Sequence, residues 1–498
     1  MESLTLPRHL PAARAVVIVA ASAVPPHALA GPVGRLAAAL EYERLPVALR
    51  RFGDEVAHPA ADFVVAALIV ASEHQARDLS GLLGQLATTA LDEAGLRTRV
   101  WVGLARTRTA VRVIAGVVPA MVGAIFLIDR HYLDPYNSAS GQLALLFVQR
   151  LEVPVVLTDL DQARVDKGVG WVHGEIDTLV SKRKISADKG NRLRALVTGS
   201  TDTSVFSDAD VVIEAVFEDL KVKQQVFAQV ESVVSDTCLL LTNTSSLSVS
   251  AMADGLVHPE RVVGFHFFNP VALMPLLEIA RAERTDDASL ATAFALGKQL
   301  KKSCVLVKDA PAFVVNRLLT RFLGEVTAAF DEGTPFDVTE RALDPLGLPM
   351  SPFVLLQLVG PAVAFHTAGT MHEAFPDRYS LSENQRRIVE SGTTTLLAWD
   401  GAVPRITDEV AALMTVGDSP STGDQVRQRA LDAVADEARR MLDEGVVAAP
   451  QDIDLCMLLG AGWPFHLGGL TPYLDRTGTS ERVTGRRFLP PGVASVPR

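Results

Sequence analysis

Between Gln142 and Lys308 the chain alternates short apolar stretches with helix-length segments, and this alternation constrains the fold more than any other feature. The helical stretch QLALLFVQRL leads into VPVVLTD, and the same kind of alternation continues in DADVVIEAVFEDLKVKQQVFAQVESVV and TCLLLTNTSSLSVSAMA. Apolar runs joined by crossover helices are typical of buried parallel strands. We therefore predict an α/β, Rossmann-like doubly wound sheet, followed by an all-α domain.

The distribution of lysine marks domain boundaries. Every lysine lies between Lys167 and Lys308, whereas the flanking segments use arginine alone. We predict an N-terminal all-α segment, a dinucleotide-binding domain and two helical C-terminal units, at residues 1–146, 147–310, 311–410 and 411–498.

The C-terminal part contains an internal duplication. DVTERALDPLGLPMSPF (337–353) matches DIDLCMLLGAGWPFHLG (452–468), which places Gly347 opposite Gly462. We expect both copies to be helical repeats that pack together.

Charge and cysteine usage narrow the functional classes. The net charge of −11 argues against nucleic acid as a partner. Cys238, Cys304 and Cys456 are isolated and lack metal-ligand spacing, so we predict no metal site. Unpaired cysteines suit a reducing compartment, and we predict a cytoplasmic protein.

The apolar run VIAGVVPAMVGAIFLI (113–128) leaves two interpretations open: a marginal membrane helix or an apolar helix packed against protein. Arginines precede the run, so as a membrane helix it would place everything after Ile128 outside the cytoplasm. That orientation would separate the following domain from its cofactor. Inner-membrane association is therefore the alternative location.

The N-terminal segment resembles a family of membrane proteins. The phrases FGDEVAHPAADFVVAALIVASEHQARDL, ARTRTAVRVIAGV and YLDPYNSASGQLALL are similar to the helical domain of the type II secretion F family, inner-membrane platform proteins of pilus assembly. The resemblance covers residues 14–146 and implies an apparent chimera.

From about Gln142 to Phe488 the chain closely resembles the 3-hydroxyacyl-CoA dehydrogenases of multifunctional fatty-acid oxidation proteins. The motifs NTSSL, GFHFFNP, PLLEIA and VVNR carry the resemblance. It implies oxidation of (3S)-3-hydroxyacyl-CoA by NAD in β-oxidation, and a homodimer formed through the C-terminal repeats. No hydratase signature occurs, so we expect no hydratase activity. The alternatives are an inactive fusion that at most binds acyl-CoA, and a membrane-associated secretion fragment.

The chemistry of this reaction explains the motifs. Oxidising a hydroxyl requires a base, and His266 of GFHFFNP is the candidate because the pKa of histidine lies near the operating pH. Glu278, on the next expected strand, would orient the imidazole. The resemblance further implies that Ser245 and Asn316 bond the substrate oxygen, and that Asn269 helps to position the substrate.

The cofactor residues are less complete. Asp159 ends an expected strand, where an acidic side chain binds the adenosine ribose hydroxyls. By the same resemblance, Glu218 and Lys223 form the pair on the nicotinamide side.

The glycine-rich phosphate loop is missing. Its three glycine positions are occupied by Pro135, Asn137 and Ser140, and the preceding strand position reads IDRHYLD, which is polar. Glycine lets the backbone approach a pyrophosphate closely, so we predict impaired cofactor binding. Ala312 and Ser351 also stand where the family usually has glycine.

Overall fold

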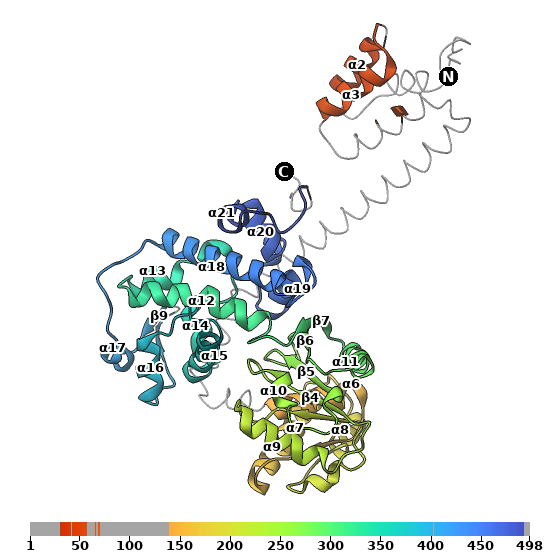
Figure 1. Ribbon diagram of the computed structural model, residues 1–498, viewed down its shortest axis with the longest axis vertical. Coiled ribbons are helices and arrows are strands. Elements are labelled where there is room, and N and C mark those ends of the chain that lie inside the picture. Colours follow the sequence, from red (N-terminus) through yellow and green to blue (C-terminus); the bar gives the residue numbers. More distant parts are fainter. Residues whose placement is uncertain are drawn as a thin grey trace, which may run out of the picture. The chain divides into compact units, whose positions relative to one another are not determined.

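The computed structural model describes residues 30–40, 42–56, 65, 68–69, 139–401 and 403–492 (Figure 1). They fall into two compact units, one holding helices α2 (Ala30–Ala39) and α3 (Leu45–Val56) and the other everything from α6 onward. The helices α2 and α3 pack through an apolar cluster that includes Leu36 of α2 and Leu49 of α3. The apolar run 113–128, most of the segment that resembles the secretion family, and the polar first-strand segment lie outside the described residues.

The second unit begins with an α/β domain, as the alternating sequence predicts. The larger sheet has the order β3-β4-β5-β6-β7, in which every neighbouring pair is parallel except β5 and β6. A separate parallel pair is formed by β1 and β2. The strands are β1 Val155–Leu157, β2 Val197–Gly199, β3 Val211–Glu214, β4 Leu239–Thr242, β5 Val262–Phe267, β6 Leu276–Arg281 and β7 Ser303–Lys308.

Helices cover both faces of the larger sheet. Apolar side chains of α6 and α11 pack on one face, and those of α9, α10 and the C-terminal helices pack on the other. The predicted Rossmann-like arrangement is thereby confirmed. The helices are α6 Ala139–Leu151, α7 Gln162–Ser181, α8 Ala187–Ala195, η2 Thr203–Phe206, α9 Leu220–Glu231, α10 Val249–Met252, η3 Pro259–Arg261 and α11 Asp287–Gln299.

In the described ranges the β1–β2 pair is not hydrogen-bonded to the larger sheet, but both sheets pack against the same helices and core residues. Leu143 of α6 packs in the core of the larger sheet, whereas Val148 of the same helix packs against the β1–β2 pair. Towards the other face, Val156 of β1 and Val212 of β3 pack against one common core. No described strand lies between β1 and β3, and the segment expected to supply the first strand falls outside the described residues.

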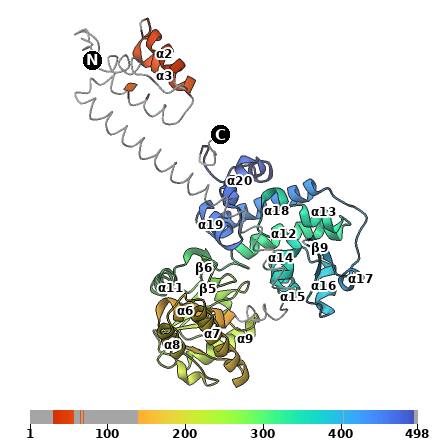
Figure 2. The same ribbon diagram turned by 180° about the vertical axis from the view of Figure 1, so that it is seen from behind.

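The C-terminal domain is mainly helical, as predicted, but it is not all-α because it contains one short antiparallel strand pair, β8–β9. The first long helices of its two repeats, α12 and α18, pack side by side (Figures 1 and 2). Its elements are α12 Val315–Asp331, α13 Phe336–Arg341, η4 Asp344–Leu346, α14 Pro352–Val359, α15 Pro361–Ala374, α16 Glu383–Glu390, β8 Leu397–Asp400, β9 Val403–Ile406, α17 Asp408–Leu413, α18 Gly423–Asp443, α19 Pro450–Gly460, η5 Phe465–Leu467, α20 Leu470–Arg476 and α21 Thr479–Thr484.

The duplicated turns contact each other. Gly347 and Gly462 both have left-handed φ values, 73° and 71°. A Cβ on Gly347 would meet His466, and one on Gly462 would meet Pro349 at 2.9 Å. Glycine is needed at these equivalent positions because the backbone conformation and the close approach both disfavour a side chain.

In the described ranges, no single helix is long and apolar enough to cross a membrane. The helices α14 and α15 reach that length and hydropathy only when taken together, and they are bent by 99° at the break between them.

A buried ion pair links α12 to α18. Arg317 Nε lies 2.6 Å from Glu437 Oε1, and both side chains have no exposed area. Arg378 Nη1 lies 2.8 Å from the other oxygen of Glu437. Phe375 packs against both guanidinium groups, whose central carbons are 4.6 and 4.1 Å from the ring centre.

We expect Glu437→Gln to lower the free energy of unfolding by about 3–5 kcal/mol, because it leaves buried arginine charge without its main partner. Urea unfolding checks this value. The control is Glu390→Gln, which removes a partner of Arg386 on an exposed helix face and should cost less than about 1 kcal/mol. Equal losses in the two variants would contradict the expectation.

Candidate active site

Strand register brings the candidate base and its partner together. In the antiparallel β5–β6 pair His266 stands directly opposite Glu278, so both side chains emerge on the same face. His266 Nδ1 lies 2.7 Å from Glu278 Oε2. His266 and Glu278 are 3% and 0% exposed, so water contributes little to stabilising a charge on the imidazole. The adjacent Glu278 carboxylate can stabilise an imidazolium ion instead.

The second oxygen of Glu278 is fixed by the C-terminal domain. Oε1 accepts hydrogen bonds from the N–H groups of Val314 and Val315, at 3.2 and 3.0 Å, where α12 begins. The first N–H groups of a helix have no partner within it, so a buried carboxylate satisfies them. The helical domain thus completes the His266–Glu278 pair.

Cys456 lies close enough to Glu278 to feel its charge, which its isolated position in the sequence did not reveal. It lies on α19 of the second repeat, which packs against β6, and it is fully buried. Burial raises the pKa of the Cys456 thiol well above its usual value, and the Glu278 charge adds to this. The thiol therefore stays protonated next to the Glu278 carboxylate.

Ser245, Asn269 and His266 share one edge of the sheet. Ser245 follows β4 and Asn269 follows β5, and the carboxyl ends of neighbouring parallel strands meet at the same edge. Asn316, in the first turn of α12, donates from Nδ2 to the Ser245 carbonyl at 3.2 Å. The structure thus brings Ser245 and Asn316 into contact, whereas Asn269 is exposed.

The glycine-to-alanine departure lies next to this site. Ala312 is buried with a left-handed φ of 57°, a conformation that disfavours residues with a side chain by about 1–2 kcal/mol. Its N–H donates to the Ser246 carbonyl at 3.2 Å. Ser351, the other departure, donates its hydroxyl to Glu340, which glycine would not do.

Asp159 follows the end of β1 and has a partly exposed carboxylate. Its Oδ1 accepts the Leu160 N–H at 2.7 Å and lies 3.8 Å from Arg164 Nη1. An exposed acidic group at the end of a parallel strand fits the ribose hydroxyls of an adenosine. The glycine positions of the phosphate loop lie outside the described residues except Ser140, which is in α6.

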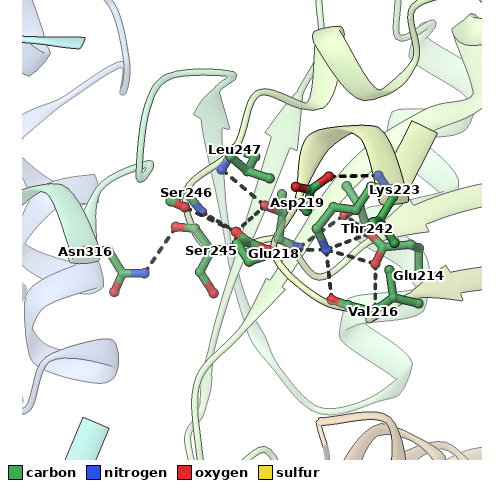
Figure 3. A network of polar contacts seen from close by, with 12 residues as sticks. Glu214, Val216, Glu218, Asp219, Lys223, Thr242, Ser245, Ser246, Leu247 and Asn316 are labelled. Carbon is green, nitrogen blue, oxygen red and sulfur yellow. Dashed lines mark hydrogen bonds and ion pairs between the residues drawn. The ribbon is translucent and has the colours of Figure 1, made fainter. Parts of the chain in front are cut away.

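Glu218 and Lys223 lie together, but Lys223 is 1% exposed (Figure 3). Its Nζ is 3.2 Å from Glu218 Oε2 and 2.8 Å from Glu214 Oε1. Burial alone would raise the pKa of Glu218, but the Lys223 charge and hydrogen bonds from Thr244 and Ser245 hold it below its usual value. Glu214 is not among the predicted site residues, because its only signal in the sequence is that an acidic residue ends an apolar strand.

Lys302 holds the segment that follows Asn269. It is 8% exposed, and its Nζ donates to the Val271 and Met274 carbonyls, the latter at 2.7 Å. Burial lowers the pKa of Lys302 to about 8, and the Arg150 charge contributes.

Because the pKa of Lys302 in the folded protein lies below the ordinary 10.5, the unfolded state binds more protons between pH 8 and pH 10.5. We expect the stability of the wild type, relative to Lys302→Met, to rise through this window by on the order of 2 kcal/mol. Urea unfolding at several pH values checks it. Exposed Lys298 provides the control, since Lys298→Met should follow the wild type; a constant difference between wild type and Lys302→Met contradicts the prediction.

The fold and the site together define a class of protein. A Rossmann-like domain carries an acidic residue after its β1 strand and a buried histidine–carboxylate pair at one sheet edge. A helical domain then supplies the N-terminus of α12 to that pair. This is the architecture of a dinucleotide-binding dehydrogenase.

Comparison with known families defines the class further. Residues 140–310 match the model of the 3-hydroxyacyl-CoA dehydrogenase NAD-binding domain, and residues 313–401 match that of the C-terminal domain of the same family. The chain therefore contains the two domains of the 3-hydroxyacyl-CoA dehydrogenases.

Individual relatives agree with the domain matches. The chain is 32% identical over 343 residues to the fatty acid oxidation complex subunit alpha of Psychrobacter arcticus, covering 66% of this chain and 48% of that protein. For the Shewanella amazonensis subunit the identity is 30% over 369 residues, 70% of this chain and 52% of that one. The chain thus spans about half the length of these relatives.

A solved structure shares the fold. The 3-hydroxybutyryl-CoA dehydrogenase of Escherichia coli is 23% identical with a TM-score of 0.59, over 71% of this chain and 94% of that one.

Proposed function

We propose that the chain oxidises (3S)-3-hydroxyacyl-CoA to 3-oxoacyl-CoA with NAD, as a step of fatty-acid β-oxidation. The buried His266–Glu278 pair, at the edge of a domain that matches an NAD-binding family, carries this proposal. Such a pair suits removal of a proton from an alcohol near neutral pH.

In the proposed reaction His266 accepts the hydroxyl proton at Nε2 while Nδ1–H donates to Glu278. The carboxylate stabilises the resulting imidazolium ion, and the N–H groups of α12 keep it in place. Ser245 and Asn316 orient the substrate oxygen. Asp159 would hold the adenosine ribose of NAD, and the bound cofactor would supply the hydride acceptor.

A second candidate is an acyl-CoA-binding protein without dehydrogenase activity. The absence of glycine at the three phosphate-loop positions favours it. We further propose a cytoplasmic homodimer formed through the helical repeats. The resemblance of residues 14–146 to the secretion family gains no support from the family matches, which begin at residue 140, and it stays a prediction.

Acetoacetyl-CoA-dependent oxidation of NADH by the purified protein tests the proposal. Turnover supports the dehydrogenase, and acetoacetyl-CoA binding without turnover supports the second candidate. Neither binding nor turnover contradicts both. Crotonyl-CoA hydration serves as a specificity control and should be absent.

A further inference from the structure

Glu214 is a buried carboxylate at the end of β3 that no part of the proposed reaction uses. Its oxygens accept hydrogen bonds from Lys223 at 2.8 and 3.0 Å, from Thr242 Oγ1 at 2.7 Å and from the Val216 N–H at 2.6 Å. The side chain has no exposed area. Two strands and one helix therefore converge on a single negative charge.

Lys223 links Glu214 to a second carboxylate, Glu218. An ammonium group has three donor hydrogens, and here the acceptors are the Glu214 carboxylate, the Val216 carbonyl at 3.3 Å and Glu218 Oε2 at 3.2 Å. Because the side chain is 1% exposed, water cannot replace a lost acceptor without a structural change. Lys223 is thus fixed between two carboxylates.

Glu218, which is paired with Lys223, also binds the loop after β4 (Figure 3). Its Oε1 accepts the Thr244 hydroxyl at 2.6 Å and the N–H groups of Ser245 and Ser246 at 2.9 and 3.0 Å. The Ser245 carbonyl in turn accepts from Asn316 Nδ2. One carboxylate oxygen therefore fixes the backbone of the loop that presents Ser245.

We propose that Glu214 is a positioning residue, which holds Ser245 in register through Lys223 and Glu218. The proposal rests on the proposed dehydrogenase reaction. A neutral residue at position 214 leaves Lys223 with a single charged partner in a dry environment, so Lys223 and Glu218 shift together and the loop moves with them. A displacement of about 1 Å at a reacting group can lower a rate by about 100-fold.

The test begins with Glu214→Gln, which keeps the size of the side chain and removes its charge. We expect kcat for acetoacetyl-CoA reduction to fall by about 10- to 100-fold, with a much smaller change in the KM for acetoacetyl-CoA. Lys223→Met should lose a similar factor, and the double variant should lose little more, because both act through one linkage. Independent losses that multiply in the double variant would overturn the proposal.

The matched control is Asp475→Asn. Asp475 is also buried and accepts hydrogen bonds from the Ser480 hydroxyl and from the N–H groups of Phe488 and Leu489, but it lies on α20. This variant should lose stability while retaining kcat. If Glu214→Gln behaves in the same way, its role is structural and the proposal fails.

Hydrogen exchange measured by mass spectrometry gives a readout that does not need activity. In Glu214→Gln, exchange should speed up in the peptide spanning residues 244–247, whereas Asp475→Asn should affect only residues near 470–489. Unchanged exchange at 244–247 overturns the proposal even if the wild type proves inactive. A wild type without turnover contradicts the proposed function, while the exchange result still decides whether the linkage exists.

Should Glu214→Gln fail to fold, the double variant Glu214→Leu/Lys223→Met replaces the buried pair by apolar groups of similar size, which proteins often tolerate. We expect it to fold and to show the same loss of kcat and the same faster exchange. Wild-type values for both would overturn the proposal.

Discussion

Replacing His266 with glutamine is expected to lower kcat for acetoacetyl-CoA reduction by about 10²–10⁴-fold, the usual contribution of a general acid–base group. In the reduction direction His266 donates the proton that it accepts during oxidation. The matched control is His258→Gln. His258 Nδ1 also faces a carboxylate, Glu260 at 3.1 Å, but it precedes β5 at the end of the strand away from His266. Its replacement should leave kcat nearly unchanged.

Glu278→Gln should act through the same imidazole. The Glu278 carboxylate accepts from His266 Nδ1 on one oxygen and from the start of α12 on the other. A glutamine that keeps its oxygen on the α12 N–H groups turns its amide N–H towards Nδ1. It thereby favours the tautomer that carries the proton at Nε2, which is wrong for a base. The double variant should lose little beyond the worse single variant, and two additive losses would show that the pair is not a unit.

Building a glycine-rich turn and an apolar strand in place of residues 129–141 is expected to tighten NADH binding by orders of magnitude. Each hydrogen bond from the backbone to a charged pyrophosphate contributes about 1.5–3 kcal/mol. A glycine-rich turn would add about two or three such bonds, which raises the affinity by orders of magnitude. The same replacement puts an apolar strand in place of the polar segment IDRHYLD. Asp159 is unchanged and has an exposed carboxylate, so weak residual binding should already be present in the natural chain.

Calorimetry with NADH and with acetoacetyl-CoA on both proteins checks this prediction. Acetoacetyl-CoA affinity should change far less, because its proposed contacts come from Ser245, Asn316 and the helical repeats. A third variant, with the apolar strand but with Pro135, Asn137 and Ser140 retained, separates the effect of the strand from that of the turn. Tight NADH binding by the unmodified chain would contradict the expectation and require another phosphate-binding loop.

Local sequence patterns were sufficient for the main architecture. Alternating apolar runs predicted the parallel strands, the duplication predicted paired helical repeats, and the succession of GFHFFNP and PLLEIA placed His266 and Glu278 on consecutive strands. The structure confirms the α/β domain with its helical partner. These features could be predicted because strand and helix formation, and the pairing of consecutive strands, depend on residues close in the sequence.

The surroundings of the candidate site could not be predicted in the same way. Lys223 stands in a segment whose polar pattern indicates an exposed helix face, yet the fold buries it between Glu214 and Glu218. Cys456 resembles any small apolar residue of a helix, yet the fold buries it where the Glu278 charge raises its pKa. Such contacts join residues far apart in the chain, and their strength depends on the loss of water around them.

The sequence by itself determined which elements form and which residue types could carry the chemistry. The tertiary structure alone decided which charges are buried, which carboxylate oxygen faces which donor, and how the second repeat reaches the His266–Glu278 pair. Arg317 and Glu437 show the reason: each occurs in an ordinary amphipathic helix, and only the packing of α12 against α18 removes both from water. Desolvation belongs to the packed assembly of elements and to no single segment, so it can be known only once the elements have been placed together.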